Sequence, residues 1–179
     1  KDPEKGLAAI TACLKDGGRM SLSLYSKVAR DYALNPALDY IKQKGYSASL
    51  DDIRQFRRDL FFMNAEDPIL RCTTASDFYN LAECNDMLFH VQEHRYTLKE
   101  FIAMADRHGL EPVHLVLPSE RKKSFLEAYP DSSVLDFDAL TEFEEKNPRT
   151  FLEMYKIYFR KKGQTAPHPF DPLIYLEAI

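Results

Sequence analysis

Two histidines and a glutamate stand close together in the segment His90-Val91-Gln92-Glu93-His94. A helix would place His90 and His94 on one face, because they are four residues apart, with Glu93 adjacent. This His-x-x-Glu-His order occurs in some zinc peptidases. No third ligand stands out, so we assign no metal, and a metal-dependent hydrolase is only one alternative. The others are a pocket wall that binds a polar substrate or moves a proton, and a buried structural network.

The composition excludes several classes of protein. The formal net charge is −4, whereas nucleic-acid binders usually carry a basic surplus. No apolar stretch reaches the 18 residues that a membrane span needs. The three cysteines, Cys13, Cys72 and Cys84, are dispersed and odd in number, so they form no disulfide framework. We therefore expect a cytoplasmic protein with reduced thiols and no nucleic-acid or membrane partner. The first residues lack a start methionine and a signal peptide, which predicts that the chain begins inside something longer or after processing.

The first half of the sequence predicts helices around one strand. Asp2 to Leu14 has helical spacing and ends at a Gly-Gly turn, and the alternation over 20–25 predicts a strand. A helix over 26–46 is expected to be interrupted at Pro36. Ser49 then begins a helix. Its expected apolar face consists of Ile53, Phe56, Leu60 and Phe61.

The second half begins with a helix–glycine–strand unit. A capping box at Thr97 begins a helix, Gly109 closes it, and 110–117 is a strand. Two helices are predicted over 119–128 and 136–146. The segment 150–162 fits both a helical and a strand period, and 77–90 fits neither cleanly. The proline-containing tail 163–179 is expected to be an extended arm.

Three stretches carry a resemblance to a known family. Residues 14–26, LKDGGRMSLSLYS, resemble the helix, "LKPGG" turn and fifth strand of class I S-adenosylmethionine-dependent methyltransferases, with Asp16 where proline is usual. Residues 86–98, DMLFHVQEHRYTL, resemble the "DLLFHVQEHRFTL" segment of a bacterial methyltransferase group that is often fused to tetratricopeptide repeats. Residues 143–155 resemble that group's "FE..NP.TF..MY" pattern. The resemblance covers nearly all of residues 1–162.

The resemblance implies an α/β fold that forms the C-terminal part of a class I methyltransferase (Rossmann-like) sheet, strands five to seven. The family's seventh strand is antiparallel and inserted beside the fifth. Residues 20–25 would be strand five, 112–117 strand six and about 153–161 strand seven. The methyltransferase part would then span 1–162, with a helical insertion over about 27–95, followed by the tail 163–179.

The resemblance also implies a function and partners. The family binds S-adenosylmethionine through a glycine-rich loop, but this chain has six glycines and no GxGxG. We therefore expect the substrate-facing portion of a methyltransferase whose cofactor-binding half lies outside this chain. Strand five would lack strand four, so its edge would pair with the missing N-terminal half or self-associate. The methyl acceptor is unknown, and the alternative function is a non-catalytic binding or assembly module.

Candidate substrate-binding residues follow from the same placement. Tyr25 would end strand five, where open α/β sheets bind ligands, and Arg30 one helical turn later would hold an anion. Asp77 and Tyr79 would also line the pocket. The alternatives are core packing for Tyr25, a solvated surface charge for Arg30 and an ordinary polar loop for the other two. The complete candidate set is Tyr25, Arg30, Asp77, Tyr79, His90, Glu93 and His94.

Overall fold

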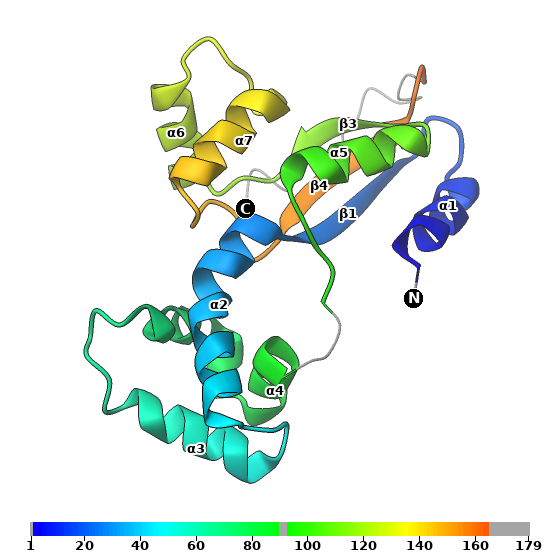
Figure 1. Ribbon diagram of the computed structural model, residues 1–179. Coiled ribbons are helices and arrows are strands. Elements are labelled where there is room, and N and C mark those ends of the chain that lie inside the picture. The colour runs from blue at the N-terminus through cyan, green and yellow to red at the C-terminus, as the bar shows by residue number, and fades with distance from the viewer. Residues whose placement is uncertain (1, 90–92, 165–179) are drawn as a thin grey trace. The chain divides into compact units, whose positions relative to one another are not determined.

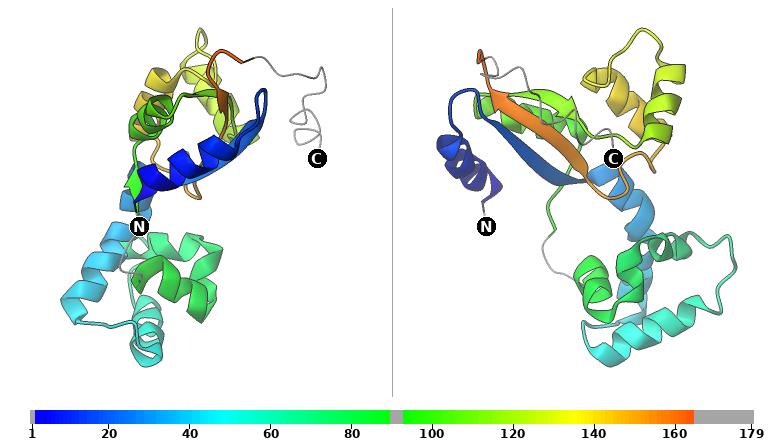
Figure 2. Two further views of the ribbon diagram at one scale, coloured as in Figure 1. Left: turned by 90° about the vertical axis from the view of Figure 1, so that its right-hand side faces the viewer. Right: turned by 180° about the vertical axis from the view of Figure 1, so that it is seen from behind.

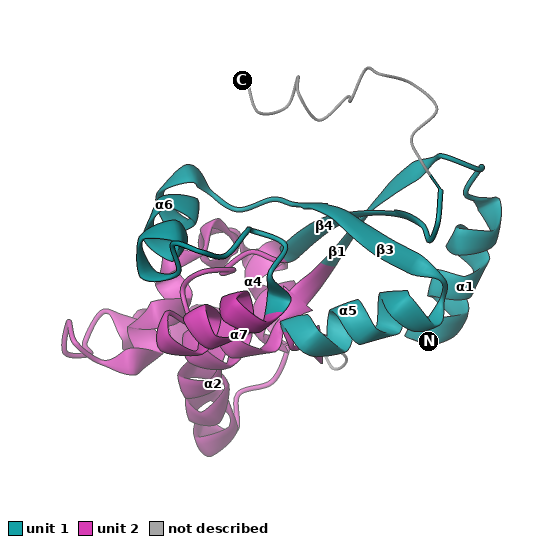
Figure 3. Ribbon diagram, turned by 90° about the horizontal axis from the view of Figure 1, so that it is seen from above, with its two compact units in different colours: residues 1–23, 98–137, 155–179 teal, residues 24–97, 138–154 magenta. Residues whose placement is uncertain are grey.

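The computed structural model describes residues 2–89 and 93–164. The chain divides into two compact units (Figure 3). Unit 1 comprises residues 1–23, 98–137 and 155–179, and unit 2 comprises residues 24–97 and 138–154. The first five residues of strand β1 (Arg19–Ser26) belong to unit 1 and its last three to unit 2.

The described residues form helices interspersed with short strands, with a run of five helical elements between β1 and β2 (Figure 1). In chain order they are α1 (Pro3–Cys13), β1 (Arg19–Ser26), α2 (Lys27–Lys44), α3 (Leu50–Leu60), η1 (Pro68–Thr74), η2 (Ser76–Tyr79), α4 (Leu81–Phe89), β2 (Arg95–Tyr96), α5 (Leu98–Arg107), β3 (Leu110–Leu115), α6 (Ser119–Ala128), α7 (Phe137–Lys146) and β4 (Tyr155–Lys161). The two η elements are 3₁₀ helices. The expected tail arm lies almost entirely outside the described residues, which end at residue 164.

The four strands form one mixed sheet in the order β2-β1-β4-β3. Strands β1 and β2 are parallel, with Tyr25 opposite Arg95 and Ser26 opposite Tyr96. Strands β3 and β4 are antiparallel, and their register shifts between Pro112 and His114. The last strand in the chain therefore lies between the first strand and β3. The protein is an α/β protein, as the sequence predicts.

Helix α5 covers one face of strands β3 and β4 in unit 1. Alternate residues of β4 are fully buried, and the ring of Phe101 on α5 lies 6.3 Å from that of Tyr155 and 5.5 Å from that of Phe159. Helix α1 lies on the same face (Figure 3). The view from behind shows β4 with no helix of unit 1 in front of it (Figure 2). Within the segment 150–162 that fitted two periods, residues 155–161 thus form a strand, because their alternate side chains pack under α5.

Local signals position several elements as predicted. Asp2 caps α1 by accepting hydrogen bonds from the N–H groups of Glu4 and Lys5. Ser49 caps α3 in the same way, through the N–H of Asp52. Gly109, with a φ of 70°, makes the left-handed turn between α5 and β3. These elements depend on neighbouring residues, which is why the sequence alone predicts them.

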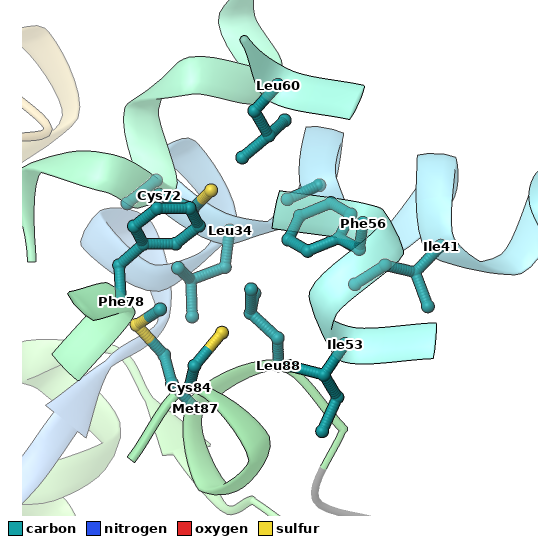
Figure 4. Close-up of a cluster of buried hydrophobic side chains, with 12 residues drawn as sticks. Leu34, Ile41, Ile53, Phe56, Leu60, Cys72, Phe78, Cys84, Met87 and Leu88 are labelled. Atoms are coloured by element: carbon teal, nitrogen blue, oxygen red, sulfur yellow. The ribbon is translucent and has the colours of Figure 1, made fainter. Parts of the chain in front are cut away.

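Unit 2 has its own apolar core (Figure 4). Phe56 of α3 lies at its centre, with ring centroids 6.5 Å from Phe78 and 6.2 Å from Phe89. The buried members come from α2, α3, η1, η2 and α4: Ala33, Leu34, Ala37, Ile41, Ile53, Phe56, Leu60, Cys72, Phe78, Cys84, Met87 and Leu88. The helical segment between β1 and β2 therefore packs largely around itself.

The predicted interruption at Pro36 is wrong, since α2 runs without a break from Lys27 to Lys44. A proline inside a helix leaves the carbonyl four residues earlier without its N–H donor, and here that carbonyl belongs to Tyr32. Arg71 of η1 donates its Nη1 to this oxygen at 3.4 Å, and its guanidinium lies 4.2 Å from the centroid of the Tyr32 ring. A side chain distant in sequence thus replaces the missing donor.

The prediction that Phe61 shares the buried face of α3 is also wrong. Ile53, Phe56 and Leu60 are buried, but Phe61 is 85% exposed. At 100° per residue, Phe61 is turned by about 100° from Leu60 around the helix axis. Phe61 is also the C-cap residue, so the chain has begun to leave the helix there.

Apolar stretches are short in every helix of the described ranges. No helix within residues 2–89 and 93–164 combines the length and the apolar character needed to cross a membrane. The longest, α2, has 18 residues and carries several charged side chains.

Candidate functional site

The carboxyl end of β1 is fixed by a serine. Ser26 ends the strand and caps α2, with its Oγ accepting a hydrogen bond from the N–H of Ala29 at 2.9 Å. The same Oγ donates to Oε1 of Glu144 on α7 at 2.5 Å. Both residues are buried, with Glu144 only 1% exposed. A buried carboxylate needs such a donor, so this bond holds α7 at the start of α2.

Arg30 lies one turn into α2 and binds Glu93. Its Nε donates to Glu93 Oε1 at 3.1 Å, and its Nη2 donates to Oε2. This two-pronged contact is the strongest geometry for an arginine and a carboxylate. The pair is shielded from water, because the two side chains are 10% and 17% exposed. Little solvent screening therefore weakens the attraction.

Arg95 joins the same carboxylate to α2. Its Nε donates to Glu93 Oε1 at 2.7 Å. Its Nη1 donates to Asp31 Oδ1 and Asn35 Oδ1, each at 2.9 Å. Asp31 and Asn35 are four residues apart, so the helix presents both to the same guanidinium.

Tyr25 packs beneath this group. The guanidinium carbon of Arg30 lies 4.1 Å from the centroid of the Tyr25 ring, which is a cation–π contact. Tyr25 also stands opposite Arg95 in the β1–β2 register. We call Tyr25, Arg30, Asp31, Asn35, Glu93 and Arg95 together the charged network.

The charged network compensates its own charges. Two guanidiniums, of Arg30 and Arg95, face two carboxylates, of Glu93 and Asp31. Both oxygens of Glu93 already accept hydrogen bonds from guanidiniums, so this carboxylate is poorly placed to take a proton from a substrate. Arg30 is similarly committed, which leaves it little capacity to hold an anion. The network therefore positions residues 93–95 on α2 and offers few groups that could react with a substrate.

Three of the sequence-predicted residues meet in this network, namely Tyr25, Arg30 and Glu93. The alternative of a solvated surface charge at Arg30 is wrong, because the residue is 8% exposed and ion-paired. Asp77 and Tyr79 lie apart from the network, on η2. Asp77 is exposed and accepts from Ser76 Oγ at 3.2 Å, and Tyr79 is 67% exposed.

The two histidines have different outcomes. His90 lies outside the described residues. His94 is exposed and lies in no helix or strand, directly before β2. Among the side chains that the structure describes, no group of three or more His, Cys, Asp or Glu could hold a metal ion.

The buried thiols are poor nucleophiles. Cys72 and Cys84 are fully buried in the core of unit 2. Burial raises the pKa of the Cys72 thiol to about 12 and also raises that of Cys84. At neutral pH neither forms the thiolate that reacts.

Several residues of the site were missed from the sequence. Arg95 stands inside the quoted segment 86–98, directly after His94, and this position was its only signal. Asp31 and Asn35 have a four-residue helical spacing that could have linked them. Glu144 belongs to the quoted segment 143–155, but nothing local indicates that it binds Ser26, which is 118 residues away.

Comparisons with protein families and with curated proteins identify no relative of this chain. No protein-family model matches it, and no curated protein matches it. The proposed function therefore rests on the strand order and on the residues of the chain itself.

Proposed function

We propose that this chain is the substrate-facing, C-terminal portion of a class I S-adenosylmethionine-dependent methyltransferase. In this proposal the cofactor-binding half lies outside the 179 residues. The charged network fixes the end of β1 and the segment around residue 93, where the methyl acceptor would enter. The acceptor itself is not assigned.

One observation carries the proposal, which is the position of β4. The chain passes β1, then β3, then β4, yet β4 lies between the other two and is antiparallel to β3. The sequence resemblance implies this arrangement for strands five, six and seven. Consecutive strands more often lie side by side, so an inserted last strand is an uncommon match.

The units that lead into the strands also support the proposal. Helix α1 leads through Gly17, at a φ of 70°, into β1, and helix α5 leads through Gly109, also at 70°, into β3. Both helices lie on the same face of the strands (Figure 3). Two successive helix–glycine–strand units of this kind are typical of α/β folds.

The outer edge of β1 is available for a further strand. The register with β2 involves only Tyr25 and Ser26, so within the described part of the chain residues 19–24 have no strand on that side. Strand β2 occupies the expected unpaired edge only at these two positions. Because β2 is parallel to β1, the edge already accepts a parallel partner, as a fourth family strand would be.

The residues present do not fit S-adenosylmethionine. The turn that follows β1 holds no glycine, and the N–H of Ala29 in the first turn of α2 already donates to Ser26 Oγ, which is also bound to Glu144. The glycines with positive φ, at 17, 45, 109 and 163, follow helices or β4 and do not form a loop that could approach a nucleotide. We therefore place cofactor binding, and every step that uses the cofactor, in the other half.

The self-compensated network favours a second candidate, a binding or assembly module without catalysis. Both oxygens of Glu93 are occupied, and Cys84 is buried with a raised pKa. A chain with these features can hold other groups in place and offer a binding surface without catalysing a reaction. The two candidates differ in whether the complete protein binds the cofactor.

Calorimetric titration with S-adenosylhomocysteine separates the candidates. The samples are the 179-residue chain and the longest protein whose reading frame contains it. The matched control is Glu111→Gln in the longer protein, since the Glu111–Arg160 pair belongs to unit 1 and the charged network to unit 2. We expect binding by the longer protein and its control, and none by the 179-residue chain.

Each other result argues against the proposal. Binding by the 179-residue chain would show that the cofactor site lies within it. Binding by neither sample would support the non-catalytic module. A third measurement, labelled-methyl transfer to a protein or small-molecule extract by the longer protein, then distinguishes an active enzyme from one that binds the cofactor without using it.

A further inference from the structure

Two adjacent phenylalanines project from unit 2 at the end of α3. Phe61 is 85% exposed and Phe62 is 90% exposed. Most other phenylalanines of the described chain are buried in the cores of the two units. The turn after α3 lies at the outer side of unit 2 in both front and rear views (Figures 1 and 2). Two exposed aromatic residues in succession present apolar surface at one point of the chain, and exposed apolar surface can mark an interaction site.

The backbone holds these rings outward. The N–H of Phe61 donates to the carbonyl of Arg58 at 3.1 Å, and that of Phe62 donates to Asp59 at 3.1 Å. On either side, Leu60 is buried in the core and Met63 packs against it. The rings cannot turn inward without displacing one of these neighbours. They are therefore preorganised, which lowers the entropic cost of binding.

The charge next to the rings is positive. Arg58 is exposed and lies in the last turn of α3, three residues before Phe61 and four before Phe62. Other charges of α3 are committed elsewhere. Asp51 binds Arg54 at 3.2 Å, Asp52 accepts from Ser47 at 2.9 Å, Asp59 accepts from Tyr46 at 2.6 Å, and Arg57 donates to the Tyr79 carbonyl at 3.3 Å. Aromatic rings beside an arginine are the composition of protein-binding hot spots.

The wider charge balance distinguishes a protein partner from a membrane. Residues 50–67 contain five carboxylates (51, 52, 59, 66, 67) against three guanidiniums (54, 57, 58), a difference of −2. An anionic lipid surface would be repelled by this segment. A protein can instead place one carboxylate opposite Arg58 and an apolar pocket around the rings.

We propose that Arg58, Phe61 and Phe62, the aromatic tip, dock into an apolar pocket with an acidic rim on a partner polypeptide. The two rings fill the pocket, and Arg58 pairs with a carboxylate at its rim. This inference does not depend on methyl transfer, because it concerns residues apart from the charged network and needs no cofactor.

The test is selection of random 15-residue peptides displayed on phage against the full chain, with removal of those that bind the Phe61→Ser/Phe62→Ser variant. We expect the remaining peptides to combine apolar residues with Asp or Glu. By fluorescence anisotropy, the double variant should bind them at least tenfold more weakly. Leu50→Ser is the matched control, because Leu50 is an exposed apolar residue at the other end of α3, and it should change Kd less than twofold.

Charge reversal tests the arginine separately. Arg58→Glu should weaken binding about fivefold, and a peptide with its acidic residues changed to lysine should restore binding to this variant alone. Since all three side chains are exposed, each variant should keep the circular dichroism spectrum and urea midpoint of the wild type.

Three results would overturn the proposal. The first is selection of peptides without acidic residues, or equal binding to the double variant. The second is sedimentation of the wild type, but not the double variant, with vesicles of 80% phosphatidylcholine and 20% phosphatidylserine, which would assign the tip to a membrane. The third is a dimer seen by light scattering that the double variant loses, which would assign the tip to self-association.

Discussion

Unit 2 has two buried regions, one apolar and one charged. The apolar core around Phe56 is held by nondirectional packing contacts between side chains from five helical elements. The charged network around Glu93 is held by directed hydrogen bonds between α2 and residues 93–95. Apolar burial contributes stability roughly in proportion to area, whereas a buried ion pair recovers little beyond its cost of desolvation. The comparison indicates that the core makes unit 2 stable and the network decides where the segment around residue 93 lies.

The core should show the largest loss when it is truncated. We expect Phe56→Ala to lower the free energy of unfolding by about 4 kcal/mol, because it removes buried surface and leaves a cavity beneath the rings of Phe78 and Phe89. Urea denaturation followed by far-UV circular dichroism measures this change. Phe62→Ala is the control, since that ring is exposed, and should change stability by less than about 0.5 kcal/mol. Equal losses in the two variants would mean that the core does not dominate.

Glu93→Ala should have the next largest effect. It leaves Arg30 and Arg95 in a shielded site without their shared carboxylate, which should cost about 3 kcal/mol. Urea denaturation at two salt concentrations measures both the loss and its weak dependence on screening.

Glu111→Ala is the matched control for this change. Its carboxylate accepts from Arg160 Nε at 2.6 Å, but both side chains are about one third exposed. The loss should be below about 1 kcal/mol and should shrink further in salt. A Glu93→Ala loss no larger than this would show that the network is energetically a surface feature.

Replacing the pair should cost less than breaking it. In Arg30→Met/Glu93→Met, no charge of the pair is left alone, so the double variant should be about 1–2 kcal/mol more stable than Glu93→Ala. The double variant should nevertheless lose the fixed placement of β2 beside β1. Hydrogen exchange of the amides at residues 25, 26, 95 and 96 should accelerate, whereas amides of α3 should not change. If those amides stay protected, the network does not position β2.

The same contrast explains what the sequence could predict. Helix α1 and strand β1 were predictable because caps, glycines and alternation act within a few residues. The continuity of α2 was not, since the Tyr32 carbonyl is bound by Arg71, 39 residues further on. The exposure of Phe61 depends on where α3 ends, which is the least predictable property of a helix.

The candidate site was predictable only in part, for the same physical reason. Tyr25 and Arg30 follow from the end of a strand, and Glu93 follows from the quoted segment. Their mutual geometry does not, because Arg30 and Glu93 are 63 residues apart. The sequence therefore indicated which side chains are polar and conspicuous, but it did not indicate that they bind each other.

The smallest expected effect concerns a polar contact beside the apolar core, between Tyr46, which follows α2, and Asp59 of α3. The Tyr46 hydroxyl donates to Asp59 Oδ2 at 2.6 Å, and the nearby carboxylate and burial raise the pKa of Tyr46 to about 12. A pKa raised above the ordinary value near 10 means that the contact stabilises the fold below pH 10 and is lost as the pH rises towards 12. Tyr46→Phe should therefore lower the urea midpoint slightly at pH 8, and the difference from the wild type should vanish by pH 12. Tyr79→Phe, which removes the hydroxyl of an exposed ring, is the control and should leave the urea midpoint at pH 8 unchanged. A Tyr46→Phe difference that persists at pH 12 would mean that the ring, packed between the helices, contributes the stability instead of the hydroxyl.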